Sequence, residues 1–225
     1  LNRFPVTVAG RIGEPGGPHY WDFTEGPTDE IYRYEYIERE NTIVWNSFKE
    51  ATIAERSYRE SEPGDYAYIM FDEVENLGRK VFGFWIINAQ FDDPSTKFTL
   101  PIIDFPAQIN YGDSWTTTAE YPNTLLGIPA VYTEVQTFDV DAYGYLELPE
   151  LGVLECLRIN SVKDFSAAID FNGTGTFTNI DRQFARIYYW LVPGKGIAAQ
   201  MVSEPSGNPV SEQFNLATMF QRMFE

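Results

Sequence analysis

The chain has 225 residues, of which 44% are hydrophobic, and this supports one large domain or two small ones with a substantial core. Lys and Arg number 16 against 33 Asp and Glu, which gives a formal net charge of −17. Such an acidic surface repels phosphate backbones, so the composition argues against nucleic-acid binding and otherwise favours solubility.

Cysteine content argues against an internal disulfide, and hydropathy argues against a membrane-spanning helix. Cys156 is the only cysteine, so no internal disulfide can form, and its apolar neighbours predict an inert buried thiol. No apolar run approaches the roughly 20 residues that a membrane-spanning helix requires. Because the chain opens at Leu1 rather than at methionine, we expect that an upstream segment was removed, either as a signal peptide or by trimming.

The first hundred residues predict an irregular segment followed by strands. Residues 1–30 are rich in Gly and Pro, with a loop at 14–18. Residues 31–40 alternate, which places Tyr32, Tyr34 and Tyr36 on one face. The run 81–87 is the most apolar of the chain and predicts a strand that is covered on both faces. Period-two patterns predict strands at 31–40, 42–48, 51–58, 66–71 and 80–88, with a turn near 76–78.

The middle of the chain, 101–162, has the pattern of an antiparallel meander. An alternating run at 131–142 is followed by a predicted turn at Tyr143-Gly144, a strand at 145–148, a turn at 149–152 and a strand at 153–160. Further strands are predicted at 164–171, 183–192 and 197–203. Residues 211–225 fit a helix or a strand, and a strand is favoured because no other segment has a helical pattern.

About a dozen strands with short connections predict an all-β protein with at most one or two short helices. No low-complexity linker divides the chain, so we expect one domain over 1–225 with an irregular segment at about 1–30. The architecture is predicted to be an antiparallel β-sandwich or a strongly curved open half-barrel.

Several short segments follow one another in a consistent order along the chain, namely Trp21-Asp-Phe-Thr24, Phe105-Pro106, Tyr111-Gly-Asp-Ser-Trp115, 140–149, Gly152 and Leu157-Arg-Ile159. Together they resemble an uncharacterised type of β-rich domain. Domains of this type occur in secreted bacterial proteins that carry a C-terminal sorting domain for outer-membrane export. The resemblance implies secretion to the periplasm or the cell surface, and it implies no activity.

Candidate catalytic and metal sites are few. His19 is the only histidine, and no Gly-x-Ser-x-Gly segment, dinucleotide-binding motif or phosphate-binding loop accompanies it. One histidine and one cysteine argue against a transition-metal site, so we predict no metal, no cofactor and no catalytic residue. Asp139 and Asp141 share a strand face and Asp92-Asp93 lies in a loop, which leaves calcium binding open, although no EF-hand pattern is present.

Aromatic side chains are the remaining candidates for ligand binding. We predict Trp115, Trp190 and Tyr188 as ligand-binding residues, because aromatic rings on an exposed sheet face can stack on sugars or hold apolar ligands. Trp115 is the best of them, since polar residues alternate with it. The opposite interpretation is that most of these rings form the core, and Trp85 fits it best because its neighbours are apolar.

Function is therefore predicted only as a class. We expect a secreted, non-enzymatic binding or structural module whose ligand is a glycan or a small apolar molecule. A lipid carrier with a half-barrel cavity and a glycoside hydrolase with a carboxylate pair are the alternatives. The sequence leaves the oligomeric state open.

Overall fold

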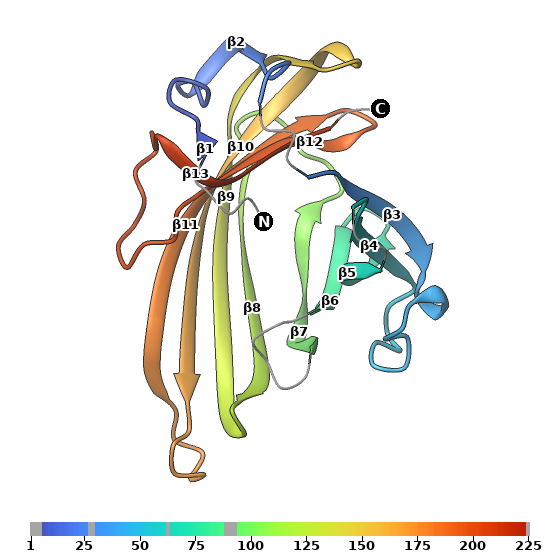
Figure 1. The fold of residues 1–225 in the computed structure, drawn as a ribbon, viewed down its shortest axis with the longest axis vertical. Coiled ribbons are helices and arrows are strands. Elements are labelled where there is room, and N and C mark those ends of the chain that lie inside the picture. The colour runs from blue at the N-terminus through green and yellow to red at the C-terminus, as the bar shows by residue number, and fades with distance from the viewer. Residues whose placement is uncertain (1–5, 27–29, 62–63, 88–93, 224–225) are drawn as a thin grey trace.

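The computed structural model describes residues 6–26, 30–61, 64–87 and 94–223, whose strands form two sheets (Figure 1). The larger sheet has eight strands in the order β1 (Val6–Thr7), β13 (Leu216–Arg222), β12 (Gly196–Ser203), β11 (Thr178–Val192), β10 (Gly152–Ile169), β9 (Ile128–Leu148) and β2 (Gly16–Asp22), with β8 (Ser114–Leu125) also paired to β9. The smaller sheet has the order β3 (Tyr32–Glu38), β4 (Ile53–Arg59), β5 (Asp65–Val74), β6 (Gly78–Ile86) and β7 (Ser95–Pro106).

The all-β class is confirmed. In the part of the chain that the structure describes, the only helical element is a single 3-10 turn at Arg39–Asn41. The strand pairs are antiparallel except for β2 and β9, which run parallel. The C-terminal segment is the strand β13, as predicted.

Strand β9 is continuous over 21 residues, so the predicted turn at Tyr143-Gly144 is wrong. One edge of β9 pairs with β10 along its whole length, whereas the other edge pairs first with β8 and then with β2. Gly144 faces the backbone of β2, where a Cβ atom would lie 2.1 Å from the carbonyl oxygen of His19. The glycine therefore permits a close approach of two strands rather than a reversal of the chain.

Two other strand predictions are also corrected. Residues 42–48 form turns rather than a strand, and their buried members Val44 and Phe48 pack on one face of the smaller sheet. The segments predicted as 153–160 and 164–171 belong to the single strand β10, which ends at Ile169. The predicted end of a strand at residue 88 and the loop at Asp92-Asp93 lie outside the described residues.

The larger sheet curls around an aromatic cluster on one of its faces. Phe23, which directly follows β2, contacts Trp190 of β11 with ring centroids 4.9 Å apart and Phe220 of β13 with centroids 5.2 Å apart. Strands β2 and β13 lie near opposite ends of the sheet order, so contacts from both to one cluster require the sheet to roll up.

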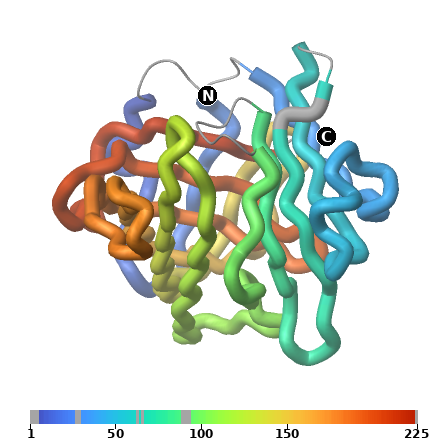
Figure 2. Tube along the Cα trace, turned by 90° about the horizontal axis from the view of Figure 1, so that it is seen from below, coloured from blue at the N-terminus to red at the C-terminus, as the bar shows by residue number. Residues whose placement is uncertain are grey.

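The opposite face of the larger sheet packs against the smaller sheet through β6 and β7. Phe84 lies 5.5 Å from Tyr121, and Phe105 lies 5.9 Å from Phe138, measured between ring centroids. Viewed from below, the two sheets lie next to each other (Figure 2). Because Trp85 packs on the far side of the same strand as Phe84, the prediction of a strand covered on both faces is confirmed.

Burial of the core predicts sensitivity to alkaline pH. It raises the pKa of the Cys156 thiol and of the Tyr188 hydroxyl to about 12 each, and also raises the pKa of Tyr121 and Tyr189. These groups hold their protons more tightly in the folded chain, so stability is complete below the ordinary values of 9.0 for Cys and 10.0 for Tyr and is lost as pH rises toward 12.

We therefore expect the free energy of unfolding to fall between pH 9 and 12, by up to about 1.4 kcal/mol per pH unit for each group that has ionised in the unfolded chain. Urea denaturation at pH 8, 10, 11 and 12 measures this slope. The Tyr188→Phe variant should have a shallower slope above pH 10. A midpoint that stays constant up to pH 12 would contradict the expectation.

Candidate functional site

Trp190 and Tyr188 lie in the aromatic core around which the larger sheet curls. Their exposed fractions are 0% and 1%, so neither ring offers a free face in this structure. The Tyr188 hydroxyl donates a hydrogen bond of 2.9 Å to the carbonyl oxygen of Glu212, and its ring stacks on Phe214. These contacts give both residues a packing role, and their binding of a ligand stays a prediction.

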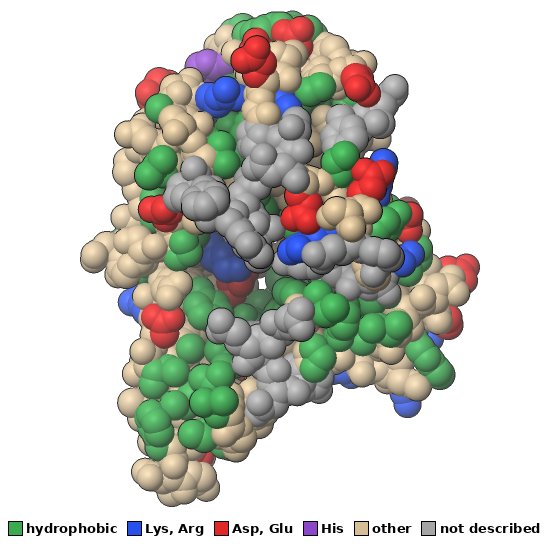
Figure 3. Space-filling view, viewed as in Figure 1, with side chains coloured by type: hydrophobic (Ala, Val, Ile, Leu, Met, Phe, Trp, Pro, Cys, Tyr) green, Lys and Arg blue, Asp and Glu red, His purple; other side chains and the backbone are tan. Residues whose placement is uncertain are grey.

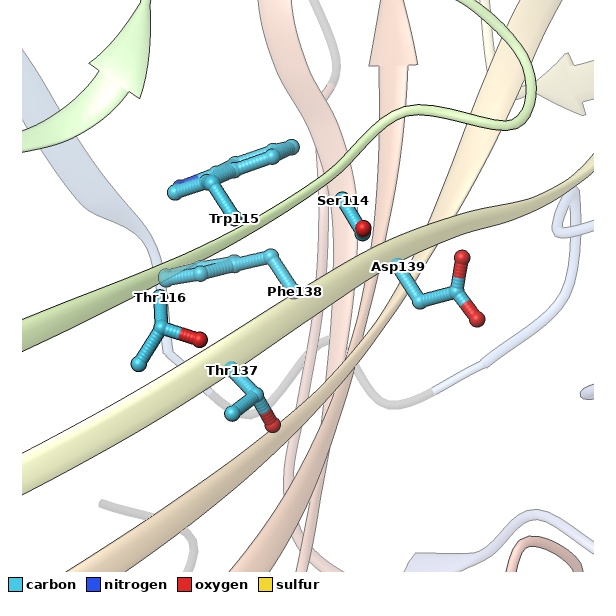
Figure 4. A pocket seen from close by; sticks show the side chains of 6 residues that line it. All are labelled: Ser114, Trp115, Thr116, Thr137, Phe138 and Asp139. Atoms are coloured by element: carbon cyan, nitrogen blue, oxygen red, sulfur yellow. The ribbon is translucent and has the colours of Figure 1, made fainter.

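Trp115 is half-buried and joins the two sheets. Its ring stacks on Phe138 with centroids 4.7 Å apart and an interplanar angle of 8°, and its Nε1 donates a 2.9 Å hydrogen bond to the carbonyl oxygen of Asp104 on β7. In Figure 4 these two rings lie face to face, while the Asp139 carboxylate lies away from them. A surface depression of about 440 Å³ is lined here by Ser114, Trp115, Thr116, Thr137, Phe138 and Asp139.

A second candidate lies between the sheets, where Figure 3 shows the surface hollowed and both hydrophobic and charged side chains on its walls. We call the space between the facing sheets the inter-sheet cleft and define it by five described residues, which are Tyr36 and Arg79 of the smaller sheet and Glu134, Gln136 and Lys163 of the larger sheet. The charges of Arg79 and Glu134 both act on the Tyr189 hydroxyl, to which Gln136 donates a hydrogen bond, and the charge of Arg79 also acts on the Tyr36 hydroxyl. Lys163 is the ion-pair partner of Glu134. Sequence reasoning did not single out Glu134, Gln136 or Lys163, because charged and amide side chains in a strand normally indicate the solvent face.

On the large-sheet wall of the cleft, several polar side chains lie within an otherwise aromatic face. Gln136 Nε2 donates hydrogen bonds to Ser161 Oγ at 2.8 Å and to the Tyr189 hydroxyl at 3.2 Å. Tyr189 in turn contacts Phe105 of β7, which shows that this face points toward the smaller sheet. Lys163, the register partner of Gln136, forms an ion pair with Glu134, and these two side chains are 33% and 23% exposed. The pair is therefore within reach of a small molecule in the cleft.

The small-sheet wall is organised around Arg79. Its Nη1 lies 2.7 Å from Glu55 Oε2, and its Nε donates to both carboxylate oxygens of Asp104 at 3.0 Å. Burial alone would lower the pKa of this guanidinium, but the hydrogen bonds and charge of Asp104 and the charge of Glu55 raise it instead. Both carboxylates are thus engaged by one cation, which argues against their service as an acid–base pair.

Tyr36 lies on the same side of the smaller sheet as Arg79, whose charge acts on its hydroxyl. Tyr36 is 72% exposed, and its ring centroid lies 5.7 Å from that of Phe71. The guanidinium of Arg79 lies over the same Phe71 ring. Desolvation is nevertheless the largest cause that raises the pKa of the Tyr36 hydroxyl, followed by the charge of Glu55. A tyrosine whose ring is accessible while its hydroxyl is desolvated is expected on the concave wall of a cleft. The alternation of 31–40 predicted the shared face of Tyr32, Tyr34 and Tyr36, but not what that face meets.

Comparison with models of known protein families, with curated proteins and with solved structures finds no match for this chain. The function must therefore be argued from the geometry of its own residues.

Of the acidic residues considered for calcium, Asp139 and Asp141 lie within the described residues, and neither belongs to a metal-binding group there. Asp141 is paired with Arg158 at 2.8 Å, and burial raises the pKa of Asp139, as do the charges of Asp141 and Glu212. Among the described side chains, no group of three or more His, Cys, Asp or Glu is arranged to hold a metal ion.

His19 lies against Trp21, with ring centroids 5.2 Å apart. No helix within the described residues has the length and apolar character to cross a membrane.

Proposed function

We propose that this protein is a non-enzymatic binding module that holds a small, mainly apolar molecule with one polar end in the inter-sheet cleft. The observation that carries this proposal is the partly exposed Glu134–Lys163 pair, with Gln136 beside it, on a face that is otherwise aromatic. Ligand sites of this class are apolar, with a few polar groups that fix the orientation of the ligand.

Lys163 is the group expected to meet the polar end of the ligand. Its ammonium carries three N–H donors, and the ion pair with Glu134 leaves donors for a ligand carboxylate or hydroxyl. The apolar part of the ligand would lie toward Phe165 and Phe84, which are half-buried and flank the cluster formed by Tyr121 and Tyr132. A long-chain fatty acid has this combination of groups. The resemblance to secreted bacterial domains supports a periplasmic or cell-surface location.

Glycan binding is the second candidate, and one observation favours it. Tyr34 and Tyr36 are 55% and 72% exposed and lie two residues apart on β3, at the edge of the smaller sheet. Rings spaced in this way can stack on sugar rings. A glycan would then bind along β3 rather than beside Lys163, so Lys163 is required by the first candidate alone.

Binding of a fluorescent fatty acid tests the first candidate. We expect cis-parinaric acid to bind saturably to the wild-type protein and to be displaced by unlabelled palmitate. The Lys163→Met variant should bind at least about 10-fold more weakly, because a hydrogen bond to a charged group is lost. Lys195→Met, in the exposed turn between β11 and β12, is the matched control and should bind like the wild type.

Two results would contradict this assignment. The wild-type protein could fail to bind cis-parinaric acid saturably, or Lys163→Met could bind it as tightly as Lys195→Met does. Binding of oligosaccharides that is lost in Tyr36→Ala but kept in Lys163→Met would establish the second candidate instead.

A further inference from the structure

Two hairpin ends lie side by side at one extremity of the larger sheet. Strands β8 and β9 are joined by the two-residue turn Leu126-Gly127, and β10 and β11 are joined by residues 170–177. Ala130 of β9 is the register partner of Ile169 of β10, so the two connections are neighbours. Figure 1 shows both at the end of the long strands that lies away from β2.

These hairpin ends expose four large apolar side chains. Leu126 is 87% exposed, Phe171 60%, Ile180 44% and Phe177 42%. Single exposed apolar residues are common on protein surfaces, but three on adjacent connections, with Ile180 close by at the start of β11, make a patch, which usually marks an interaction site. We call these four residues the apolar tip.

The conformation of Leu126 indicates that folding alone does not explain its presence. Leu126 and Gly127 have φ angles of 53° and 76°, the left-handed region that a type I′ turn requires at both positions. Asn is strongly preferred to Leu at the first of these positions, because it tolerates positive φ. A leucine here is both conformationally unfavourable and almost completely exposed, so its side chain is better explained by an external contact.

The same region carries almost no charge on a strongly acidic protein. Residues 121–133 contain no Asp, Glu, Lys or Arg, and residues 165–180 contain only Asp170. Asp170 is 4% exposed, and its carboxylate accepts backbone N–H groups of Gly175 at 2.7 Å, Thr174 at 3.2 Å and Asn172 at 3.3 Å. Asp181 and Arg182, which follow Ile180, are exposed, but the two connections themselves present only apolar and neutral polar groups to a partner.

We propose that the apolar tip docks on a lipid surface and inserts its side chains at the boundary between headgroups and acyl chains. Two narrow hairpin ends offer little of the roughly 800 Å² per partner that a stable protein interface buries, whereas they can enter a fluid interface. The lack of Lys and Arg at the tip and the net charge of −17 favour neutral, zwitterionic lipid over an anionic surface. This inference does not depend on the ligand of the inter-sheet cleft.

Co-sedimentation with sucrose-loaded vesicles of pure phosphatidylcholine tests the proposal. We expect the wild-type protein to partition onto these vesicles, and more weakly onto vesicles with 30% phosphatidylserine at low salt. The double variant Leu126→Asn/Phe171→Ser should lose at least 10-fold in partitioning, while its melting temperature stays equal or rises because Asn suits the turn. The matched control, Ile43→Ser/Leu100→Ser, removes two apolar residues that are 66% and 74% exposed outside the tip, and should partition like the wild type.

Three results would overturn the proposal. The wild-type protein could stay in the supernatant with phosphatidylcholine vesicles, or the tip variant could partition as well as the control. In the third, sedimentation velocity shows that the wild-type protein is a dimer, that the dimer does not bind vesicles, and that the tip variant is a monomer. This result would assign the tip to contact with a second copy of the chain. Cis-parinaric acid binding in solution reports on the cleft separately from each of these.

Discussion

Replacing Arg158 with methionine is expected to lower the free energy of unfolding by about 3–5 kcal/mol, because it breaks a buried ion pair by removing one partner. Arg158 is 1% exposed, and its Nε and Nη2 donate to the two carboxylate oxygens of Asp141 at 2.9 and 2.8 Å. Its Nη1 donates to the carbonyl oxygens of Ile12 and Gly13 at 2.6 and 2.8 Å. The substitution would leave one carboxylate and two carbonyl groups without these donors.

The neighbouring pair of strands, β10 and β11, provides a matched control for this result. Arg182 of β11 pairs with Asp164 of β10 in the same two-donor geometry, but its side chain is 64% exposed. Exposed ion pairs contribute little, so Arg182→Met should lower the free energy of unfolding by less than about 1 kcal/mol. Urea denaturation followed by tryptophan fluorescence measures both variants, and equal losses in the two would show that the buried network is not important for stability.

A Gly144→Ala substitution is expected to lower the free energy of unfolding by about 3 kcal/mol, at the upper end of what overpacking normally does. The added Cβ would lie 2.1 Å from the His19 carbonyl oxygen and 2.5 Å from its backbone nitrogen, so β2 would have to move away from β9. Displacement of β2 would also draw Trp21, which is 3% exposed, out of the aromatic core.

Hydrogen exchange distinguishes this local effect from a general loss of stability. The backbone amides of β2 should lose protection in Gly144→Ala before those of β10 and β11 do. Gly207→Ala is the control, because an added Cβ there meets no atom within 4 Å. A Gly144→Ala variant with the urea midpoint of Gly207→Ala would show that β2 does not need this close approach.

The sequence was sufficient for the fold class and for most strands, because alternation of side chains and turn residues are local signals. It was misleading where a glycine has a tertiary role. Gly144 has the local signature of a turn, yet it lies inside the longest strand, and only the approach of β2 explains it. The prediction of a strand at 42–48 was wrong for a related reason, since apolar residues in turns can pack on a sheet without belonging to a strand.

The candidate site was less predictable, because the larger sheet is covered on both faces over part of its length. Tyr188 and Tyr189 point to opposite faces, and both are buried, so aromatic content along β11 cannot separate core from binding surface. The inward position of Lys163 depends on how the two sheets pack, which no period-two pattern encodes. The tyrosine face of β3 was visible in the sequence, but the proximity of Tyr36 to Arg79 was not.

The parallel pairing of β2 with β9 has a consequence for the order of folding events. Strands β9, β10 and β11 are joined by short turns and can form early as a meander, whereas β2 must wait for a contact between residues 16 and 142. During synthesis β2 emerges first, and its partner follows more than a hundred residues later. We expect the last slow step of folding to be the capture of this strand, with Trp21 exposed to water until that moment.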